Sequence, residues 1–281
     1  MGCAAVLRWL REGVVLRCAA AAALFSLGAA ASAQAGRESI AIQVAEPLAA
    51  TISADLYTPR GKSPFPAVVL FHGCGGVTPN VPAWAQWLQS EGYAALVVNS
   101  FQGRGLGNIC GDSTPLRPEE RAVDVFAAAA KLESMGVADP DRIAAMGFSH
   151  GGSTVLAAWR THGKHPEVKL RALIAFYPGC AGRLATPDAP PLLILAGGKD
   201  DWAPAEPCVK LEAAAREAGR AVTLVVYPDA RHHFDGATLK RVVFVSNARG
   251  GKGATMEYDP AAHADSEKQV KQFLAAQLGP R

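Results

Sequence analysis

The chain has 281 residues, with 28 Lys and Arg against 25 Asp and Glu and a formal net charge of +3. A charge so close to zero provides neither a basic field for nucleic acid nor a strongly acidic surface. The length suits one α/β domain with a large core, and 28 glycines and 19 prolines fit many tight loops without a low-complexity tract.

The first 33 residues have the three parts of a secretory signal peptide. A region with three arginines precedes an apolar stretch over residues 18–30, and Ala31-Ser32-Ala33 forms an A-x-A cleavage site. The apolar stretch is short for a membrane span, which disfavours an uncleaved anchor. The residues before Cys18 lack the small side chains of a lipoprotein site. We therefore expect a periplasmic or secreted protein without a stable membrane anchor, whose mature chain, 34–281, is a single domain.

Beyond this leader, apolar and polar residues alternate over residues 40–44 and 52–57, which predicts an antiparallel hairpin. Short apolar runs then alternate with segments that carry helix start and stop signals. The runs predict buried strands at 67–71, 94–98, 143–148, 170–177, 191–196 and 222–227, and the segments predict helices at 82–91, 118–135, 153–159, 204–217 and 261–277. This order is typical of an α/β fold with helices on both faces of a mostly parallel sheet. Residues 236–262 are either a lid or an extra strand.

One predicted strand runs directly into Gly147-Phe148-Ser149-His150-Gly151, and a predicted helix follows. The segment matches G-x-S-x-G, a sharp strand-to-helix turn that lifts a serine hydroxyl out of the sheet. Glycines at both ends leave space where side chains would clash. We expect Ser149 to be a nucleophile; the alternative is a glycine-rich turn with a solvated serine.

Serine is a weak nucleophile at neutral pH, so it needs a base, and the base needs an orienting acid. Candidates for both follow in the chain, each just after a predicted strand, where active sites of open parallel sheets gather. Asp200 is the candidate acid, with Asp201 as the fallback, although both could be solvated turn residues. His232 is the candidate base and His233 its alternative. Adjacent histidines point apart in extended chain and no third ligand has supporting spacing, so we expect no metal site.

The oxyanion that develops during acyl transfer needs hydrogen-bond donors. The first candidate donor is the backbone N–H of His150, which follows the nucleophile. The second is the N–H of Cys74, in the loop after the strand at 67–71.

Four cysteines lie outside the leader, and an even number in an exported chain predicts two disulfides. Three pairings are possible, and buried free thiols are the alternative. A metal site is disfavoured because no C-x-x-C occurs. We favour Cys74–Cys110, because this bond would hold the oxyanion loop and tie down the long loop 99–118. Cys180–Cys208 would then link neighbouring strand-end loops beside the candidate acid.

Six segments together form a specific pattern: Phe71-His72-Gly73-Cys74-Gly75-Gly76, Phe101-Gln102-Gly103-Arg104-Gly105, Gly147-Phe148-Ser149-His150-Gly151-Gly152, Tyr177-Pro178-Gly179-Cys180, Gly198-Lys199-Asp200-Asp201-Trp202-Ala203-Pro204 and His232-His233-Phe234-Asp235. The pattern resembles the dienelactone hydrolase family of α/β-hydrolases, especially its exported members. It covers the chain from about residue 50 to the C-terminus. The resemblance implies the α/β-hydrolase fold and a hydrolase of esters or lactones.

The family's motifs imply particular residues here. Its acid is the first Asp of a G-x-D-x-x-x-P loop, which implies Asp200, and its histidine lies two residues before a Phe, which implies His232. The dienelactone-cleaving members use a cysteine nucleophile and a glutamate in the early loop, where this chain has Ser149 and His72. The resemblance therefore does not imply dienelactone as the substrate.

Two further roles follow from the resemblance. Arginines of the family meet a substrate carboxylate, which implies such a role for Arg104; the alternative is a loop arginine bound to backbone carbonyls. Trp202, Phe101 and Tyr177 are candidates for an acyl pocket, and each could equally belong to the core.

The sequence thus predicts an exported serine hydrolase that cleaves a small-molecule ester or lactone through an acyl-enzyme and needs no cofactor. One alternative is a small serine peptidase of the same fold, although the chain has no room for the propeller domain of prolyl peptidases. The other is a non-catalytic protein that binds small acyl compounds.

Overall fold

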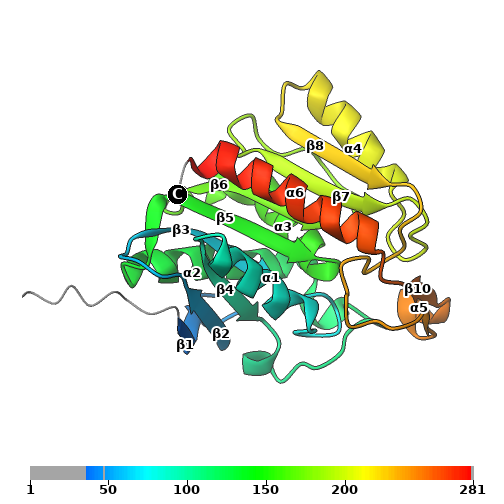
Figure 1. The fold of residues 1–281 in the computed structure, drawn as a ribbon, viewed down its shortest axis with the longest axis horizontal. Coiled ribbons are helices and arrows are strands. Elements are labelled where there is room, and N and C mark those ends of the chain that lie inside the picture. The colour runs from blue at the N-terminus through cyan, green and yellow to red at the C-terminus, as the bar shows by residue number, and fades with distance from the viewer. Residues whose placement is uncertain (1–35, 47, 280–281) are drawn as a thin grey trace, which may run out of the picture. The chain divides into compact units, whose positions relative to one another are not determined.

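An eight-stranded sheet forms the centre of the computed structural model, which describes residues 36–46 and 48–279 (Figure 1). Across the sheet the strands are β1 (Gly36–Val44), β2 (Ala50–Thr58), β4 (Ala94–Asn99), β3 (Phe65–Phe71), β5 (Ala138–Phe148), β6 (Leu170–Phe176), β7 (Leu192–Gly197) and β8 (Val222–Tyr227). β2 pairs antiparallel with both β1 and β4, and the strands from β4 to β8 are parallel. The predicted signal peptide, residues 1–33, lies outside the described residues.

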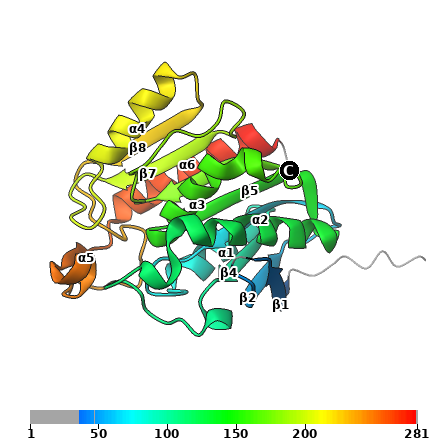
Figure 2. The ribbon, with the colours of Figure 1, turned by 180° about the vertical axis from the view of Figure 1, so that it is seen from behind.

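Helices cover both faces of this sheet. α1 (Asn80–Ser90) and α6 (Pro260–Leu278) lie on one face, and α2 (Pro118–Ser134), α3 (His150–Thr161) and α4 (Glu206–Glu217) lie on the other (Figures 1 and 2). Short 3₁₀ helices are η1 (Gln102–Arg104), η2 (Thr114–Leu116) and η3 (His162–Lys164). Because both faces are covered, all seven residues of β3 are buried, which explains its continuous apolar run. The mostly parallel, helix-covered sheet predicted from the sequence is confirmed. The strand predicted at 222–227 is present, but the prediction that it is buried is wrong, because β8 is an edge strand and none of its residues is buried.

Two of the helices, α2 and α6, begin where the sequence supplies a side-chain cap. Pro118 occupies the first position of α2, and the Glu120 carboxylate accepts a hydrogen bond from the N–H of Arg117 at 3.1 Å. At the start of α6, the Asp259 carboxylate accepts from the N–H groups of two residues in the first turn, each at 3.0 Å. No helix of the described residues is long and apolar enough to span a membrane.

The segment for which the sequence allows a lid or an extra strand forms a separate two-stranded sheet. β9 (Val243–Val245) pairs antiparallel with β10 (Ala254–Met256), and the short α5 (Ala248–Gly251) connects them. Figure 1 shows this part, in orange, beyond the ends toward which β5 and β7 point. We call residues 236–256 the ribbon segment. It joins the body of the protein through a parallel bridge between His232 and Met256.

Candidate active site

Ser149 lies at the turn between β5 and α3, with a backbone φ of 54°, in the left-handed region. The turn needs glycine at both ends. A Cβ on Gly147 would lie 2.1 Å from the carbonyl oxygen of Gly151, and a Cβ on Gly151 would lie 2.1 Å from that of Phe71. The N–H of Ser149 donates to the carbonyl of Phe176 on β6 at 2.9 Å. The turn therefore has the strained geometry that G-x-S-x-G predicts.

Ser149, His232 and Asp200 form a continuous chain of hydrogen bonds. His232 Nε2 lies 2.8 Å from Ser149 Oγ, and His232 Nδ1 lies 2.7 Å from Asp200 Oδ2. The other oxygen of Asp200 accepts from the backbone N–H groups of Trp202 and Ala203, both at 2.8 Å. These bonds fix the carboxylate, so Nδ1 of His232 donates to Asp200 and Nε2 is left to accept from the serine. His232 is 2% exposed and Asp200 5% exposed, which strengthens this polar chain.

The two alternative residues point elsewhere. Asp201 accepts hydrogen bonds from the backbone N–H and the hydroxyl of Thr255, at 2.8 and 2.9 Å, and so anchors the ribbon segment. His233 has a φ of 64° and places its Nδ1 3.4 Å from the Tyr177 hydroxyl. Burial lowers the pKa of His233. Neither residue joins the chain of hydrogen bonds at Ser149.

The two candidate oxyanion donors come from the residue after Ser149 and from the loop after β3. α3 begins at His150, so the N–H of this residue belongs to the first turn, which has no acceptor within its own helix. The loop after β3 passes close above the serine, because a Cβ on Gly73 would lie 3.5 Å from Ser149 Cβ. Cys74 follows in that loop, and its carbonyl accepts from the N–H of Ile109 at 2.9 Å.

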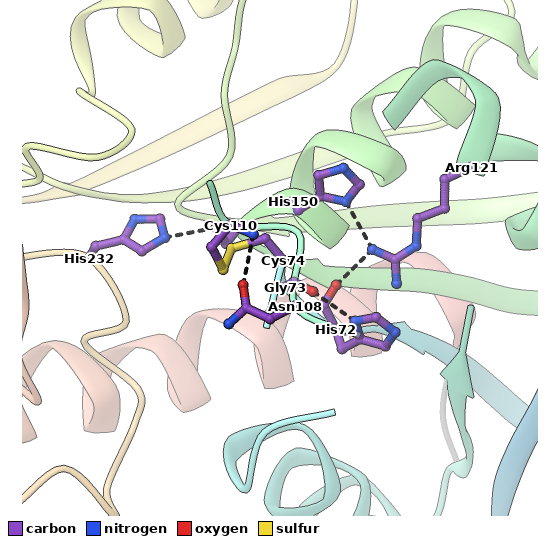
Figure 3. Close-up of a disulfide and its surroundings, with 9 residues drawn as sticks. His72, Gly73, Cys74, Asn108, Cys110, Arg121, His150 and His232 are labelled. Carbon is purple, nitrogen blue, oxygen red and sulfur yellow. Dashed lines mark hydrogen bonds between the residues drawn. A yellow bond between two sulfur atoms is a disulfide. The ribbon is translucent and has the colours of Figure 1, made fainter. Parts of the chain in front are cut away.

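Both disulfides are present in the pairings that the sequence favours. Cys74–Cys110 joins the loop after β3 to the long loop after β4, with a Cα–Cα distance of 4.8 Å (Figure 3). Cys180–Cys208 joins the loop after β6 to the first turn of α4. The sequence predicts this bond as a link between two loops, but Cys208 lies in a helix. The Cys74–Cys110 bond thus holds the candidate oxyanion loop against the long loop after β4, and both cysteines line the cavities at Ser149.

A fully buried arginine lies directly behind the candidate oxyanion donors, and the sequence did not single it out. Nη1 of Arg121 donates to the carbonyl of His72 at 2.8 Å and lies 3.1 Å from Nδ1 of His150, as Figure 3 shows. Its Nε donates to the Ser100 hydroxyl at 3.0 Å. Burial lowers the pKa of Arg121 to about 9. The sequence did contain a signal that Arg121 is buried. It lies one turn before Val125 and two turns before Ala128, on the buried face of α2.

The charge of Arg121 acts on both neighbouring histidines. Burial, followed by the nearby Arg121 charge, lowers the pKa of His150 to about 3. The same two causes hold the pKa of His72 well below its usual range. Both imidazoles are therefore neutral at neutral pH. Nδ1 of His150 can then accept from Arg121, and Nδ1 of His72 donates to the Gly73 carbonyl at 2.7 Å.

A second buried network lies under the histidine loop. The Asp235 carboxylate is 2% exposed and accepts from Tyr177 Oη at 2.6 Å, and from Asn80 Nδ2 and Trp84 Nε1 at 2.9 Å. The Tyr177 ring contacts the ring of His232, with centroids 4.7 Å apart. Burial, followed by the nearby Asp235 carboxylate, raises the pKa of Tyr177. This network connects α1 and the end of β6 to the loop that carries His232.

Arg104 and Phe101 do not reach the site. The guanidinium of Arg104 forms two hydrogen bonds to the Asp124 carboxylate, at 2.8 and 2.9 Å, and donates to the carbonyls of Ser100 and Leu48. Arg104 is therefore not free to bind a substrate carboxylate. It matches the alternative given in the sequence analysis, a loop arginine bound to backbone carbonyls, and it also binds the carboxylate of Asp124. Phe101 is 2% exposed and packs in a small apolar cluster.

Two cavities meet at Ser149. One, of about 360 Å³, extends past Tyr177 toward Arg249, and the other, of about 290 Å³, extends past His233 toward Leu239. Trp202 lines both cavities, and its ring lies 4.9 Å from that of His232. The non-glycine residues with positive φ in the described ranges all line these cavities: Ser149, Tyr177, His233 and Arg249. Backbone strain of this kind gathers at functional sites. Within the described ranges, no group of His, Cys, Asp and Glu could hold a metal.

Known proteins resemble this chain in sequence and in fold. A Methylorubrum extorquens protein named "Putative carboxymethylenebutenolidase" is 28% identical over 195 residues, which cover 63% of this chain and 65% of that protein. The match thus spans just under two thirds of that relative. A dienelactone hydrolase-like promiscuous phosphotriesterase from metagenomic libraries has a TM-score of 0.66 and 21% identity, over 88% of this chain and all of that one.

An α/β-hydrolase from a Medee basin deep-sea metagenome has a TM-score of 0.61 and 16% identity, over 88% of this chain and 100% of that one. At such identities the structures show the fold alone, which is the α/β-hydrolase fold. The sequence model of the dienelactone hydrolase family matches residues 52–278, which is most of the chain. This protein therefore belongs to the dienelactone hydrolase family.

Proposed function

We propose that this protein is a serine hydrolase that cleaves a small carboxylic ester or lactone. The observation that carries the proposal is the chain of hydrogen bonds from Ser149 through His232 to Asp200, at 2.8 and 2.7 Å. Family membership and the two cavities that meet at the serine support it. No cofactor takes part.

In the first half of the reaction, Ser149 Oγ attacks the carbonyl carbon while its proton passes to His232 Nε2. Asp200 stabilises the imidazolium that forms, and the N–H groups of Cys74 and His150 donate to the oxyanion. The tetrahedral intermediate then collapses, the bond to the alkoxide breaks, and His232 gives its proton to the alkoxide oxygen. In a lactone this alcohol stays attached to the acyl group.

In the second half, water attacks the acyl-enzyme and His232 Nε2 accepts its proton. Collapse of the second tetrahedral intermediate releases the carboxylic acid, and the proton returns to Ser149 Oγ. The two cavities favour a substrate whose acyl and alcohol parts extend in different directions from the scissile bond, with Trp202 beside both.

We further propose that the protein is exported to the periplasm or secreted, with residues 1–33 removed and residues 34–281 forming one domain. The leader pattern supports export. Two disulfides, Cys74–Cys110 and Cys180–Cys208, suit an oxidising compartment.

A fluorophosphonate probe tests the function directly, because it labels only an activated serine. We expect an adduct that mass mapping places on Ser149 and that is absent in Ser149→Ala. Asp200→Asn should slow labelling by about 10⁴-fold, as expected when the orienting acid of a triad is neutralised. Asp201→Asn is the matched control, since Asp201 binds Thr255 rather than His232, and it should label within about threefold of the parent rate.

Failure of this experiment has a clear meaning. A folded protein without an adduct, or with an adduct elsewhere, would refute the serine mechanism and favour a protein that binds acyl compounds without cleaving them. Equal loss of labelling in both aspartate variants would remove Asp200 from its proposed role.

A further inference from the structure

The ribbon segment, residues 236–256, concentrates positive charge on a nearly neutral protein. It contains four basic residues and no Asp or Glu. The four are Lys240, Arg241, Arg249 and Lys252. All are exposed, and none forms an ion pair with a carboxylate of the described residues. By contrast, Lys210 on α4 pairs with Glu206 one turn away. The ribbon segment thus presents a local positive surface whose cations have no ion-pair partner in the part of the chain that the structure describes.

The same segment exposes its largest apolar side chains. Phe244 is 65% exposed and Val242 is 51% exposed, more than any other large apolar residue of the described ranges. Phe244 lies above Gly253, where a Cβ would lie 2.1 Å from the ring, so glycine lets the two strands of the ribbon approach. Side chains alternate along a strand, which places Phe244 on the face opposite Val243 and Val245. An aromatic residue among free cations is the composition of an interfacial binding surface.

The other face of the ribbon segment borders the site. Val245 and Met256 line the 290 Å³ cavity beside Ser149, and Arg249 lines the 360 Å³ cavity. Asp201, which directly follows Asp200 of the triad proposed above, anchors the segment through Thr255. A partner that binds to the outer face of the ribbon segment would therefore lie next to both cavities.

We propose that the ribbon segment binds reversibly to an anionic phospholipid surface, with Phe244 and Val242 inserted at the headgroup level and three of the four basic residues, Lys240, Arg241 and Lys252, against the phosphates. Arg249 stays on the inner face, where its Nη1 donates to the Asp201 carbonyl at 2.9 Å. Charge complementarity selects this occupant. A second copy of the chain, docked symmetrically through this face, would bring the same three cations together and repel them. An anionic surface attracts each of them, and neutral lipid would offer the two apolar side chains alone too little area.

The test is co-sedimentation with vesicles, using the Ser149→Ala variant so that no lipid is cleaved. Binding does not depend on the function proposed above, so failure of either proposal is recognised separately. Vesicles contain phosphatidylcholine alone, or phosphatidylcholine with about one third phosphatidylglycerol. We expect binding to the anionic vesicles at about 0.1 M salt, and its loss at about 1 M salt, where the Debye length falls to about 3 Å.

Two paired variants locate the surface. Lys240→Gln with Arg241→Gln should weaken the partition coefficient by about 25-fold, because each cation near an anionic surface contributes about fivefold. Val242→Ser with Phe244→Ser should weaken it by about tenfold through lost apolar contact. The matched control is Val209→Ser with Lys210→Gln on α4, which removes an exposed apolar residue and a cation elsewhere and should leave binding unchanged.

Circular dichroism and thermal unfolding establish that each variant is folded. Equal binding to both vesicle types, absence of binding at low salt, or equal losses in the ribbon and α4 variants would overturn the proposal. So would a concentration-dependent dimer that the Phe244→Ser change abolishes, in a protein that does not bind vesicles.

Discussion

Two arginines on one side of the sheet, one fully buried and one largely buried, differ in their partners. Arg104, 10% exposed, forms a double hydrogen bond to the buried carboxylate of Asp124. Arg121, fully buried, hydrogen-bonds only neutral groups among the described residues, including the carbonyl of His72 and Nδ1 of His150. One Nη of Arg121 has no hydrogen-bond partner in the described ranges. The charge of Arg104 thus has a hydrogen-bonded counter-ion. The charge of Arg121 is unmatched in the sense that no counter-ion of the described residues hydrogen-bonds to it, although the nearby Asp124 carboxylate offsets part of its burial.

The difference indicates what each arginine does. A paired charge in the interior stabilises its partner, so its removal affects the whole fold. An unmatched buried charge costs free energy, which the lowered pKa of Arg121 reflects. Its hydrogen bonds join the segment that carries Cys74 to the residue after Ser149. We therefore interpret Arg121 as a positioning residue for the candidate oxyanion donors, and Arg104 as part of the fold.

The largest effect is expected for Arg104→Met, which removes both hydrogen bonds that the buried Asp124 carboxylate accepts from Arg104. Loss of one member of a buried pair costs about 3–5 kcal/mol, so the free energy of unfolding should fall by that amount. Denaturant unfolding measures the change. Turnover per folded molecule should stay within about threefold of the parent, because Arg104 does not line either cavity.

Arg104→Lys is the graded control for this effect. It keeps the positive charge beside Asp124 and loses the two-pronged geometry, so it should cost less than Arg104→Met. If Arg104→Met were as stable as the parent, the ion pair would not stabilise the fold and the contrast with Arg121 would disappear.

Arg121→Met should act on turnover instead. Complete loss of an oxyanion donor costs about 3 kcal/mol, and displacement of two donor segments should cost part of that, so we expect kcat to fall by about 10- to 100-fold. KM should stay near the parent value, because Arg121 does not touch the cavities. Arg121→Lys should recover part of kcat. Steady-state kinetics on a soluble ester provide the test, and a parent-like kcat in Arg121→Met would refute the positioning role.

The fold was predictable because each of its parts obeys a local rule. Parallel strands covered on both faces must be apolar throughout, and runs such as 67–71 have that composition. The candidate site was predictable for a related reason. Ser149, Asp200 and His232 lie beyond the C-terminal ends of the parallel strands β5, β7 and β8, so the sheet brings them to one edge. The order Ser, Asp, His along the chain then predicts which residue hydrogen-bonds to which.

Residues that act through groups distant in the sequence were not predictable. The partners of Arg121 are a carbonyl 49 residues earlier and a ring 29 residues later, and no pattern of residue types encodes such contacts. Asp235 is similar, because its donors Asn80 and Tyr177 come from separate elements. For Arg104, the family resemblance suggested a substrate ligand, but the preference of its guanidinium for Asp124 depends on the packing of α2 against the long loop.

The smallest expected effect concerns pH. The pKa of His150 is lowered to about 3 by burial and by the charge of Arg121, and the same causes lower that of His72. Between about pH 6.5 and pH 3 the unfolded chain binds protons that the folded chain does not, so stability falls as pH falls through this window. Arg121→Met removes the second cause and raises both pKa values.

The variant should therefore lose less stability than the parent between pH 7 and pH 4, by about 1 kcal/mol. Denaturant unfolding at the two pH values measures this difference, and NMR titration of the His150 ring measures the pKa itself. His150→Gln removes one of the two titrations, so adding Arg121→Met to it should produce a smaller change than in the parent background. Parallel pH curves for the parent and Arg121→Met would mean that burial alone keeps these histidines neutral. The unmatched charge of Arg121 would then act only through its hydrogen bonds.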